Sequence, residues 1–367
     1  MKSSEGIERM RNGPLLVYGA RLAGISVHSY LKAIGIEIAG FLDRDAKALQ
    51  WVKDCPVVTA EQWAGDCAND LSNATLIMGL FNSRVDQEAL VGYLRSLGYR
   101  TILSLVDFVR LFPDNQPFRY WLVDPRFYEE NAPALARFRA RLVDTASREL
   151  LDDIVGFRTG NGHWHLPPPS PHQYSPRDVP AWPKRLRLID CGAYTGDTVQ
   201  ELLDCGYEFD ALATFEPNLQ NYFHLTRNIK GINATHFPCG VSDSNRLSAF
   251  DSSSDTGGHL SDFPKGGTDT VVCVRLDDAL PEFSPNLIKM DIEGEEPAAL
   301  LGGRTIIERF RPNLAICVYH RADHLWSICD LIDQISPGYS FYLRSHARNT
   351  FEVVLYAITS PLQAGQS

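Results

Sequence analysis

The chain has 367 residues, of which 44% are hydrophobic and 22% charged, and its formal net charge is −10. This length predicts two or three domains, each with enough apolar side chains for its own core. The negative charge argues against a nucleic-acid partner, which would need clustered Lys and Arg. The first residues, MKSSEGIERMRNG, lack the apolar core of a signal peptide, and no apolar run approaches the roughly 18 residues of a membrane span.

The eight cysteines are scattered and include no CxxC pair. Several lie in apolar runs such as ICVY and VVCV, which is typical of reduced cysteines in a core. We therefore expect no disulfide framework, and we expect a cytoplasmic protein.

The first region, residues 1–110, alternates strand and helix patterns. Strands are expected in LLVYG, IEIAGFLDRD, ATLIMGL and TILSL, and helices in GISVHSYLKAIG and VDQEALVGYLRSLG. This βαβ series predicts a Rossmann-like α/β domain with a small parallel sheet.

The second region, residues 111–185, is expected to form a helical connector followed by a Pro-rich loop. ENAPALARFRARLVDTASRELLDDIV repeats apolar residues at helical spacing. RTGNGHWHLPPPSPHQYSPRDVPAWP is rich in Pro, Gly, Ser and His, so we interpret it as a linker or an ordered loop rather than a packed element. With Tyr174 and Trp182, such a segment is a candidate lid over a ligand crevice.

The third region, residues 186–367, resumes the alternation. Strands are expected in LRLID, LATFE, THFPCGV, NLIKMD, NLAICVYH, SFYLR and FEVVLYAI, with extra strands in LSAFD and TVVCVRL. The last two main strands are joined across HARNT with no room for a helix, so one of them must run antiparallel. Seven strands with that reversal are the layout of the S-adenosylmethionine-dependent methyltransferase fold.

A glycine turn follows the first of these strands, in LIDCGAYTGDT. Gly192 and Gly196 let backbone N–H groups approach a ligand closely, and Asp190 and Asp197 flank the turn with negative charge. Acids at this place suit a cationic ligand, such as the amino and sulfonium groups of S-adenosylmethionine, better than a pyrophosphate.

A carboxylate ends the next strand, in TFEPN. Glu216 lies 20 positions after Gly196, the distance at which an acid usually binds ribose hydroxyls. Taken singly, Asp190 and Glu216 are equally consistent with helix-capping or surface acids. Their order along the chain favours a nucleoside site.

Further chemistry-bearing residues end the fourth and fifth strands. NLIKMDIEGEE delivers Lys289, Asp291 and Glu293, and LAICVYHRADH delivers His320. In a parallel sheet these residues should meet Asp190 and Glu216 at one edge, where ligands bind. A stability role for the acids, as complements to a helix dipole, applies to Glu295 and Glu296 and stays open for Asp291.

Together, LIDCGAYTGDTV, TFEPN, CGVSD, KMDIEGEEPAALLGG and LAICVYHRADHLW resemble the FkbM-type methyltransferases over about Leu186 to Ile358. The resemblance implies S-adenosylmethionine as cofactor and O-methylation of sugars or natural products. It implies that Asp190, Gly192 and Gly196 hold the methionine part and that Glu216 holds the ribose. CGVSD would lie by the adenine, with Ser242 as the single best candidate. The expected cofactor-binding residues are Asp190, Gly192, Ala193, Tyr194, Gly196, Asp197, Thr198, Glu216, Pro217, Asn218, Ser242 and Asp291.

Methyl transfer to a hydroxyl needs alignment and a group that removes the acceptor proton. We expect His320 to be that base, with Asp291 as the second candidate or as the group that orients the base. Lys289 is expected to stabilise a developing oxyanion. A buried structural role for His320 is the alternative. A divalent metal at Asp291, Glu293 and His320 is left open, and no metal ligand is assigned.

The chain holds a second glycine turn near its start, in LVYGARLAG. Gly19 and Gly24 fit a GxGxxG pattern, but Arg21 stands at the middle glycine, and Asp43 follows Gly19 by 24 positions. VYGA, GFLDRD and VVTAEQW resemble the small nucleotide-binding-like domain that precedes some sugar acyltransferases. This domain either binds a nucleotide or nucleotide sugar, or is a positioning module that lost its ligand.

The expected function is an S-adenosylmethionine-dependent O-methyltransferase acting on a sugar, nucleotide sugar or natural product. The alternatives are an NAD-dependent oxidoreductase or epimerase that uses the first turn, and a non-catalytic binding protein with a methyltransferase fold. The expected partner is a small-molecule or carbohydrate acceptor, without nucleic acid or membrane, and a homodimer is left open.

Overall fold

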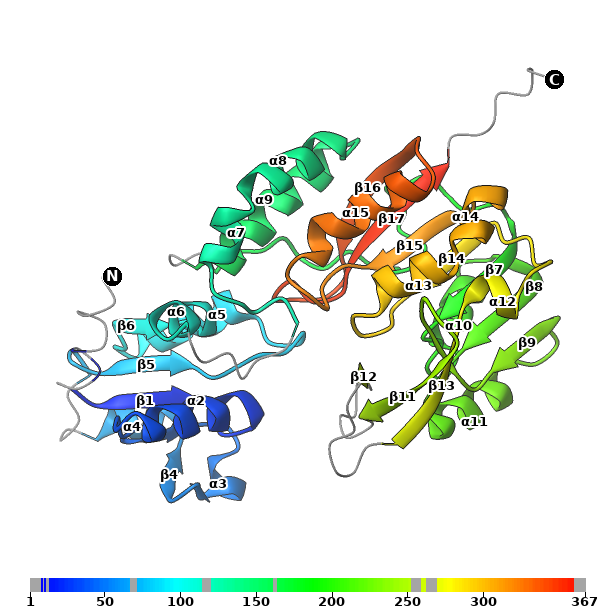
Figure 1. Ribbon diagram of the computed structural model, residues 1–367. Helices are drawn as coiled ribbons and strands as arrows, with labels where there is room; N and C mark the ends of the chain where they lie inside the picture. The colour runs from blue at the N-terminus through cyan, green and yellow to red at the C-terminus, as the bar shows by residue number, and fades with distance from the viewer. Residues whose placement is uncertain are drawn as a thin grey trace. The chain divides into compact units, whose positions relative to one another are not determined.

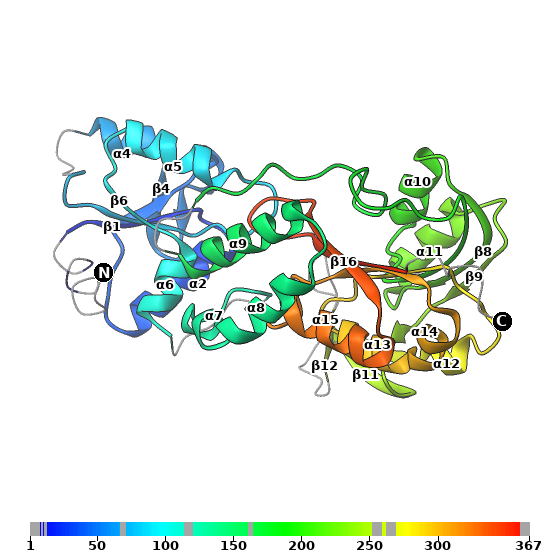
Figure 2. The same cartoon turned by 90° about the horizontal axis from the view of Figure 1, so that it is seen from above.

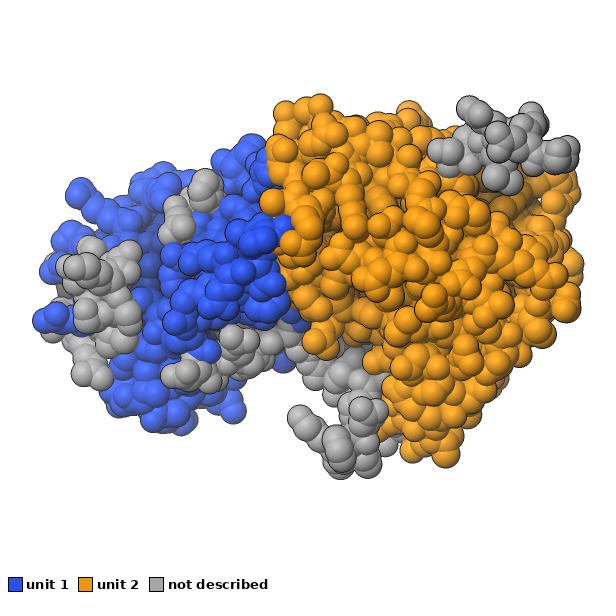
Figure 3. All heavy atoms as spheres, turned by 45° about the horizontal axis from the view of Figure 1, so that its top comes forward, with its two compact units in different colours: residues 1–133, 151–168, 347–351 blue, residues 134–150, 169–346, 352–367 orange. Residues whose placement is uncertain are grey.

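The computed structural model describes residues 8, 10, 13–66, 71–113, 120–160, 164–251, 259–261 and 269–359, with residues 250, 251, 259–261 and 269 described by backbone alone. The chain divides into two compact units, which Figure 3 colours separately. The amino-terminal unit comprises residues 1–133, 151–168 and 347–351, and the carboxy-terminal unit comprises residues 134–150, 169–346 and 352–367. Region 111–185 contributes residues to both units.

The amino-terminal unit is built on a six-stranded sheet of order β3-β4-β2-β1-β5-β6. All its pairings are parallel except that of β3 with β4, so the predicted parallel sheet is confirmed. The strands are β1 (Leu15–Tyr18), β2 (Gly40–Leu42), β3 (Trp51–Val52), β4 (Cys55–Val58), β5 (Thr75–Met78) and β6 (Thr101–Leu103).

Helices cover both faces of this sheet, α4 and α5 on one face and α2 and α6 on the other (Figure 2). The helices of this part are α2 (Leu22–Ala33), α3 (Ala46–Leu49), α4 (Ala60–Gly65), α5 (Gln87–Ser96), α6 (Leu105–Leu111) and α7 (Arg126–Glu130). The helices α8 (Ala132–Arg141) and α9 (Thr145–Thr159) contain residues of both units.

The carboxy-terminal unit holds a seven-stranded sheet of order β16-β17-β15-β14-β7-β8-β9 (Figure 1). Its strands are β7 (Arg185–Cys191), β8 (Glu208–Phe215), β9 (Ala234–Phe237), β14 (Leu287–Met290), β15 (Asn313–Cys317), β16 (Tyr339–Ser345) and β17 (Val353–Thr359). β17 is antiparallel to both β15 and β16, whereas β7, β8, β9, β14 and β15 pair in parallel. The predicted fold, with its reversed last strand, is confirmed.

Helices α10 and α11 lie on one face of this sheet, and α13, α14 and α15 lie on the other (Figure 2). Burial on both faces explains why β14 and β15 read as continuous runs, LIKM and NLAIC, and are buried at every position. The helices are α10 (Asp197–Asp204), α11 (Leu219–Asn228), α12 (Leu276–Ala279), α13 (Glu296–Gly302), α14 (Arg304–Phe310) and α15 (His324–Ile335).

The extra strands predicted in LSAFD and TVVCVRL are confirmed, but they belong to a separate four-stranded sheet of order β10-β13-β11-β12. These strands are β10 (Gly240–Val241), β11 (Arg246–Asp251), β12 (His259–Ser261) and β13 (Asp269–Val274). This small sheet follows β9 directly along the chain.

Residues 169–184 of the Pro-rich segment form an ordered loop, which is one of the two predicted alternatives, and buried side chains pack this loop into the unit. Residues 169–184 form no helix or strand, yet Tyr174, Val179 and Trp182 are buried in the carboxy-terminal unit. The indole Nε1 of Trp182 donates a hydrogen bond to the carbonyl of Tyr174. Burial of Tyr174 and Trp182 holds this segment in place, and amino-acid composition does not predict this burial.

Seven cysteines are described and all are free, as predicted, with five of them buried; Cys67 lies outside the described residues. Over the part of the chain that the structure describes, no helix is long and apolar enough to cross a membrane.

Arg344 of β16 ties three segments of the carboxy-terminal unit together. Its guanidinium donates to the carboxylates of Asp144 and Asp178, each at 2.7 Å, and to the hydroxyl of Ser147 at 2.8 Å. The side chain of Arg344 is only 5% exposed, so its charge depends on these partners.

Replacing Arg344 with Met should lower the free energy of unfolding by about 2 to 4 kcal/mol, because Asp144 and Ser147 lose a buried partner. Urea denaturation of the full chain measures this change. Arg185→Met is the matched control: Arg185 is 61% exposed and pairs with Glu208 and Asp210, so it should cost less than about 1 kcal/mol. Equal effects of the two substitutions would contradict the anchoring role.

Candidate functional site

The candidate site lies at the carboxyl edge of four neighbouring strands. β15, β14, β7 and β8 are adjacent and parallel, so the residues at or after their ends meet at one edge of the sheet. This edge receives Asp190, Glu216, Asp291 and His320, the four residues that the sequence predicts there. In open parallel α/β sheets, ligands bind at this edge.

The glycine turn after β7 packs directly against the end of β14. Gly192 has φ of 78°, and a Cβ at this position would lie 2.0 Å from the carbonyl oxygen of Asp291. The N–H of Gly192 donates to the carbonyl of Phe215 at 2.9 Å. Only glycine fits here, so the turn and Asp291 are held together by backbone contact.

Glu216 is buried, and its carboxylate is oriented by the glycine turn. Its two oxygens accept the N–H groups of Tyr194 at 2.8 Å and Asn218 at 2.9 Å. Burial raises the pKa of Glu216 to about 7, against these hydrogen bonds and the charge of Lys289. Each carboxylate oxygen has a further lone pair, so this geometry is compatible with the predicted ribose contact.

Asp190 and Lys289 form a buried ion pair beneath the turn. The Nζ of Lys289 lies 3.1 Å from Asp190 Oδ1 and also donates to the carbonyl of Gly192. Burial alone would lower the pKa of Lys289, but the carboxylates of Asp190 and Asp291 outweigh it and raise this pKa. The ammonium group therefore stays charged and holds the turn, a positioning role; its predicted action on an oxyanion stays a prediction.

Tyr174 of the Pro-rich segment covers this ion pair. Its ring centroid lies 5.3 Å from the Nζ of Lys289, within reach of a cation–π interaction, and its hydroxyl donates to Asp291 Oδ2 at 3.3 Å. Burial raises the pKa of Tyr174 well above its usual value, so the hydroxyl keeps its proton. The lid predicted for this segment remains a prediction.

His320 lies between two carboxylates. Its Nδ1 is 2.8 Å from Glu296 Oε1, and its Nε2 is 3.3 Å from Asp291 Oδ1. Glu296 also accepts the N–H of Ile292 at 2.9 Å and lies 3.3 Å from His324 Nδ1. Asp291, His320, Glu296 and His324 thus form one continuous polar chain.

The charges of these side chains determine the protonation of His320 and Asp291. Burial would lower the pKa of His320, but Glu296 and Asp291 raise it well above the usual value. Burial would raise the pKa of Asp291, but His320 and Lys289 outweigh it and lower this pKa. His320 is therefore an imidazolium that lies between the ionised carboxylates of Asp291 and Glu296.

The exposed fraction of each side chain shows which of these residues can contact an acceptor and which are covered by other side chains. The side chain of His320 is 0% exposed and that of Asp291 is 25% exposed. Glu293 is 17% exposed and lies 3.9 Å from His320 Nε2. Alternation along β14 ends before Glu293, whose φ of 58° places it in a turn.

The other predicted cofactor residues surround the same turn. Ala193 and Thr198 are buried, whereas Tyr194, with φ of 46°, and Asp197 are exposed. Gly196, with φ of 93°, is the N-cap of α10. Their contacts with a cofactor stay predictions.

Three more predicted residues lie beyond the turn. Asn218 caps α11, accepting the N–H groups of Gln220 and Asn221, and Pro217 is half-buried beside it. Ser242 is fully buried, and its hydroxyl accepts from the Nη1 of Arg246 at 2.8 Å. The proposed adenine contact of Ser242 is not tested by this geometry.

Glu352 is a site residue that the sequence reasoning missed. It accepts hydrogen bonds from the Tyr319 hydroxyl at 3.1 Å and from Gln173 Nε2 at 3.0 Å. Because β17 is antiparallel, the residue before its first position lies at the carboxyl edge of the parallel strands. The predicted hairpin already contained this signal.

Glu352 also completes a candidate metal cluster among the described residues. Single ligand atoms of Asp291, Cys317 and Glu352 all lie within 4.8 Å of one another. This set shares only Asp291 with the set considered from the sequence. Burial and the charge of Asp291 raise the pKa of Glu352.

The strand order, the reversed last strand and the glycine turn after the first strand define a methyltransferase fold of the Rossmann-like class. Residues 190–344 match the model of the methyltransferase FkbM domain. These residues form a domain of the FkbM family, and the protein is an S-adenosylmethionine-dependent methyltransferase.

A solved structure shares this fold. The crystal structure of methyltransferase FkbM from Methylobacillus flagellatus KT matches with a TM-score of 0.79 and 20% identity, covering 98% of this chain and 94% of that chain. Fibrillarin from Aeropyrum pernix, in complex with natively bound S-adenosyl-L-methionine, matches with a TM-score of 0.33 and 10% identity, covering 49% of this chain and 70% of that chain. The first match shows the shared fold. No curated protein matches the chain.

Gly192→Ala should weaken the binding of S-adenosylhomocysteine at least about tenfold, because the new Cβ would press on the backbone of Asp291. Isothermal titration calorimetry measures this affinity. Gly231→Ala is the matched control: Gly231 has φ of 75° with nothing within 4 Å of a Cβ, so it should cost about 1 kcal/mol of stability and leave affinity unchanged. Unaltered binding in Gly192→Ala would refute the close packing of the turn as a requirement.

The affinity for S-adenosylhomocysteine should fall several-fold as the pH drops from 8.5 to 5.5. Burial raises the pKa of Glu216 to about 7, so Glu216 is mostly a carboxylate at pH 8.5 and mostly protonated at pH 5.5. The protonated form accepts fewer hydrogen bonds from ribose hydroxyls. In Glu216→Gln the affinity should be weaker and no longer follow this pH profile; a profile that survives the substitution would assign the titration to another group.

Proposed function

We propose that the protein is an O-methyltransferase that acts on a hydroxyl group of a sugar, nucleotide sugar or natural product. One observation carries this proposal: the glycine turn expected to hold the donor touches the backbone of Asp291, whose carboxylate is the partly exposed acid of the polar chain. A methyl donor on the turn and a proton acceptor at Asp291 would thus lie side by side.

Charge supports S-adenosylmethionine as the donor. Asp190, Asp197 and Asp291 place negative charge around the turn, which favours the amino and sulfonium groups of this molecule. Glu216 would accept the ribose hydroxyls, and Ser242 would lie by the adenine. The donor supplies an activated methyl group, so the protein has to align it and to receive a proton.

The proton step follows from the exposure of the side chains. The acceptor oxygen forms a bond to the methyl carbon while the carbon–sulfur bond breaks, and the electron pair of that bond stays on sulfur. The hydroxyl proton passes to Asp291, the accessible carboxylate. His320, held by Glu296, is a positioning residue that fixes Asp291 and compensates its charge.

A divalent metal stays unassigned in this proposal, and no step requires one. A carbohydrate or other small-molecule acceptor, the cytoplasmic location and a homodimer also stay predictions.

Asp291→Asn should lower kcat by about 100-fold or more, because the acceptor proton loses its carboxylate, and should weaken the affinity for S-adenosylhomocysteine by a much smaller factor. The assay follows tritium from methyl-labelled S-adenosylmethionine into a panel of sugars and nucleotide sugars, and calorimetry gives the affinity. Asp323→Asn is the control and should leave kcat unchanged; Asp323 is a half-buried acid that lies 3.5 Å from Arg321.

His320→Asn should lower kcat less than Asp291→Asn and should shift the pH profile of kcat, since it removes the charge that lowers the pKa of Asp291. Normal kcat in both Asp291→Asn and His320→Asn would overturn the catalytic assignment. Absence of labelled product with every hydroxyl acceptor, alongside methylation of an amine or thiol, would overturn the O-methyl assignment.

A further inference from the structure

The amino-terminal unit repeats the backbone frame of the donor site. β1 lies between β2 and β5, as β7 lies between β8 and β14, and all four pairings are parallel. Tyr18 is in register with Leu42 and Met78, as Cys191 is with Phe215 and Met290. These registers make three residue pairs equivalent: Gly19 and Gly192, Asp43 and Glu216, Gly79 and Asp291.

The backbone hydrogen bonds of the two glycine turns match. The N–H of Gly19 donates to the carbonyl of Leu42 at 2.8 Å, as that of Gly192 donates to Phe215 at 2.9 Å. At the neighbouring strand, the N–H of Gly79 donates to Tyr18 at 2.8 Å. This bond corresponds to the one from the N–H of Asp291 to Cys191 at 3.1 Å.

The acid after the second strand is held in the same way in both units. Asp43 accepts the N–H of Ala20 on Oδ2 and that of Asp45 on Oδ1, both at 2.9 Å. Glu216 likewise accepts one N–H from its turn and one from the residue two positions onward. Asp43 is 8% exposed, so a buried carboxylate is aimed at the turn where a Rossmann fold binds ribose.

The charged residues Asp190, Lys289 and Asp291 of the donor site have no charged counterparts at the equivalent positions of the amino-terminal unit, which we call the first frame. The registers put Val17 at the place of Asp190, Ile77 at the place of Lys289 and Gly79 at the place of Asp291. A Cβ at Gly79 would lie 2.6 Å from the Cα of Gly24, so this place is closed by backbone packing. The first frame therefore retains the nucleoside acid and lacks a reacting group.

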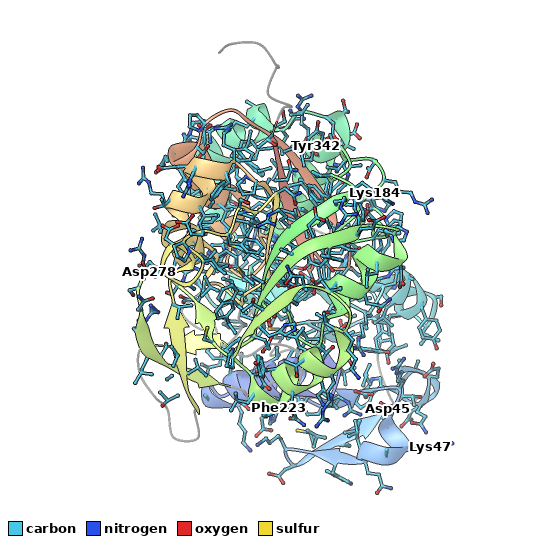
Figure 4. The ribbon with its side chains drawn as sticks, turned by 90° about the vertical axis from the view of Figure 1, so that its right-hand side faces the viewer. Asp45, Lys47, Lys184, Phe223, Asp278 and Tyr342 are labelled. Carbon is cyan, nitrogen blue, oxygen red and sulfur yellow. The ribbon has the colours of Figure 1, made fainter. Side chains whose placement is uncertain are left out.

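The charge at the start of the following helix also differs between the two units. Helix α10 begins with Asp197, whereas α2 begins with the apolar Leu22, has no acid in its first turn and no side-chain cap. Its N-cap residue Arg21 is 69% exposed and lies 3.2 Å from Asp45, which is labelled in Figure 4. A guanidinium beside an open helix N-terminus favours an anion.

We infer that the amino-terminal unit binds a nucleoside 5′-phosphate, free or as part of a nucleotide sugar. The ribose hydroxyls of the nucleotide bind Asp43, and its phosphate lies at the start of α2. There Arg21 leaves Asp45 and pairs with the phosphate. The site binds and does not react. This inference does not depend on the nature of the methyl acceptor.

The test uses the full chain saturated with S-adenosylhomocysteine, which fills the donor site so that added nucleotides report on the first frame. Calorimetry with UDP, ADP, GDP and UDP-glucose separates free nucleotides from a nucleotide sugar. A 2′,3′-dideoxynucleoside diphosphate and inorganic phosphate are the probes without a ribose diol. Binding of at least one ribose diphosphate, about tenfold tighter than its dideoxy analogue and than phosphate, is expected.

Three variants locate the site. Asp43→Asn should weaken the best diphosphate at least about tenfold and leave S-adenosylhomocysteine binding unchanged, whereas Glu216→Gln should do the reverse. Arg21→Ala, at an exposed position that does not endanger folding, should weaken the diphosphate several-fold and leave the parent nucleoside unchanged.

The inference is overturned if none of the four nucleotides gives heat at millimolar concentration, or if the dideoxy analogue and phosphate bind equally well. It is also overturned if the affinity survives both Asp43→Asn and Arg21→Ala. If the wild-type protein does not bind S-adenosylhomocysteine, that result counts instead against the proposed methyl transfer. The failure of the inference and the failure of the proposed function are therefore distinguishable.

Discussion

The ammonium group of Lys289 is the point on which the carboxy-terminal site depends. Three strand-end acids, Asp190, Asp291 and Glu216, come together at one edge of a sheet, and burial makes such a gathering of charge costly. Lys289 pairs with Asp190, attracts Asp291 and donates to the carbonyl of Gly192. One cation thus compensates the acids and fixes the loop expected to hold the donor. The imidazolium of His320 performs the same compensation for Asp291 and Glu296 on the other side.

The two units share one backbone frame, for which we propose two kinds of ligand. In both, a glycine N–H bonds across to the second strand and the acid after that strand receives N–H groups from the turn. The side chains added to this frame differ. Acids and Lys289 surround the second turn, where the methyltransferase class requires a cationic donor, whereas Arg21 and an acid-free helix start follow the first turn. Charge, rather than topology, separates the two assignments.

Much of this arrangement was predictable because it depends on strand order. Alternating strands and helices, together with a final hairpin too short for a crossover helix, predict the sheet and its reversed last strand. The same topology brings Asp190, Glu216, Asp291 and His320 to one edge. The depth of each side chain was not predictable, because periodicity does not tell whether a strand-end residue faces solvent. His320 is fully buried, so the proposed mechanism gives it a positioning role, and the prediction that it is the base stays a prediction.

Other parts depend on contacts between segments that are distant in sequence. Tyr174 lies 117 positions from the Asp291 that it contacts, in a segment whose composition is typical of a loop. Glu296 is the helix N-terminal acid that the sequence predicts, and its contacts with His320 and His324 depend in addition on the packing of α13 against α15. The reversed last strand predicts that a residue before it lies at the site, but identifying this residue as Glu352 requires the register of the strand.

The most direct measurement of the central claim is a double-mutant cycle between Asp190 and Lys289. Urea denaturation and S-adenosylhomocysteine calorimetry would be applied to Asp190→Asn, Lys289→Met and the double variant. Each single change is expected to destabilise the protein and to weaken S-adenosylhomocysteine binding, and the double variant is expected to be more stable than the sum of the single effects by about 2 kcal/mol or more. Strictly additive effects on stability, or wild-type affinity in Lys289→Met, would contradict the central claim.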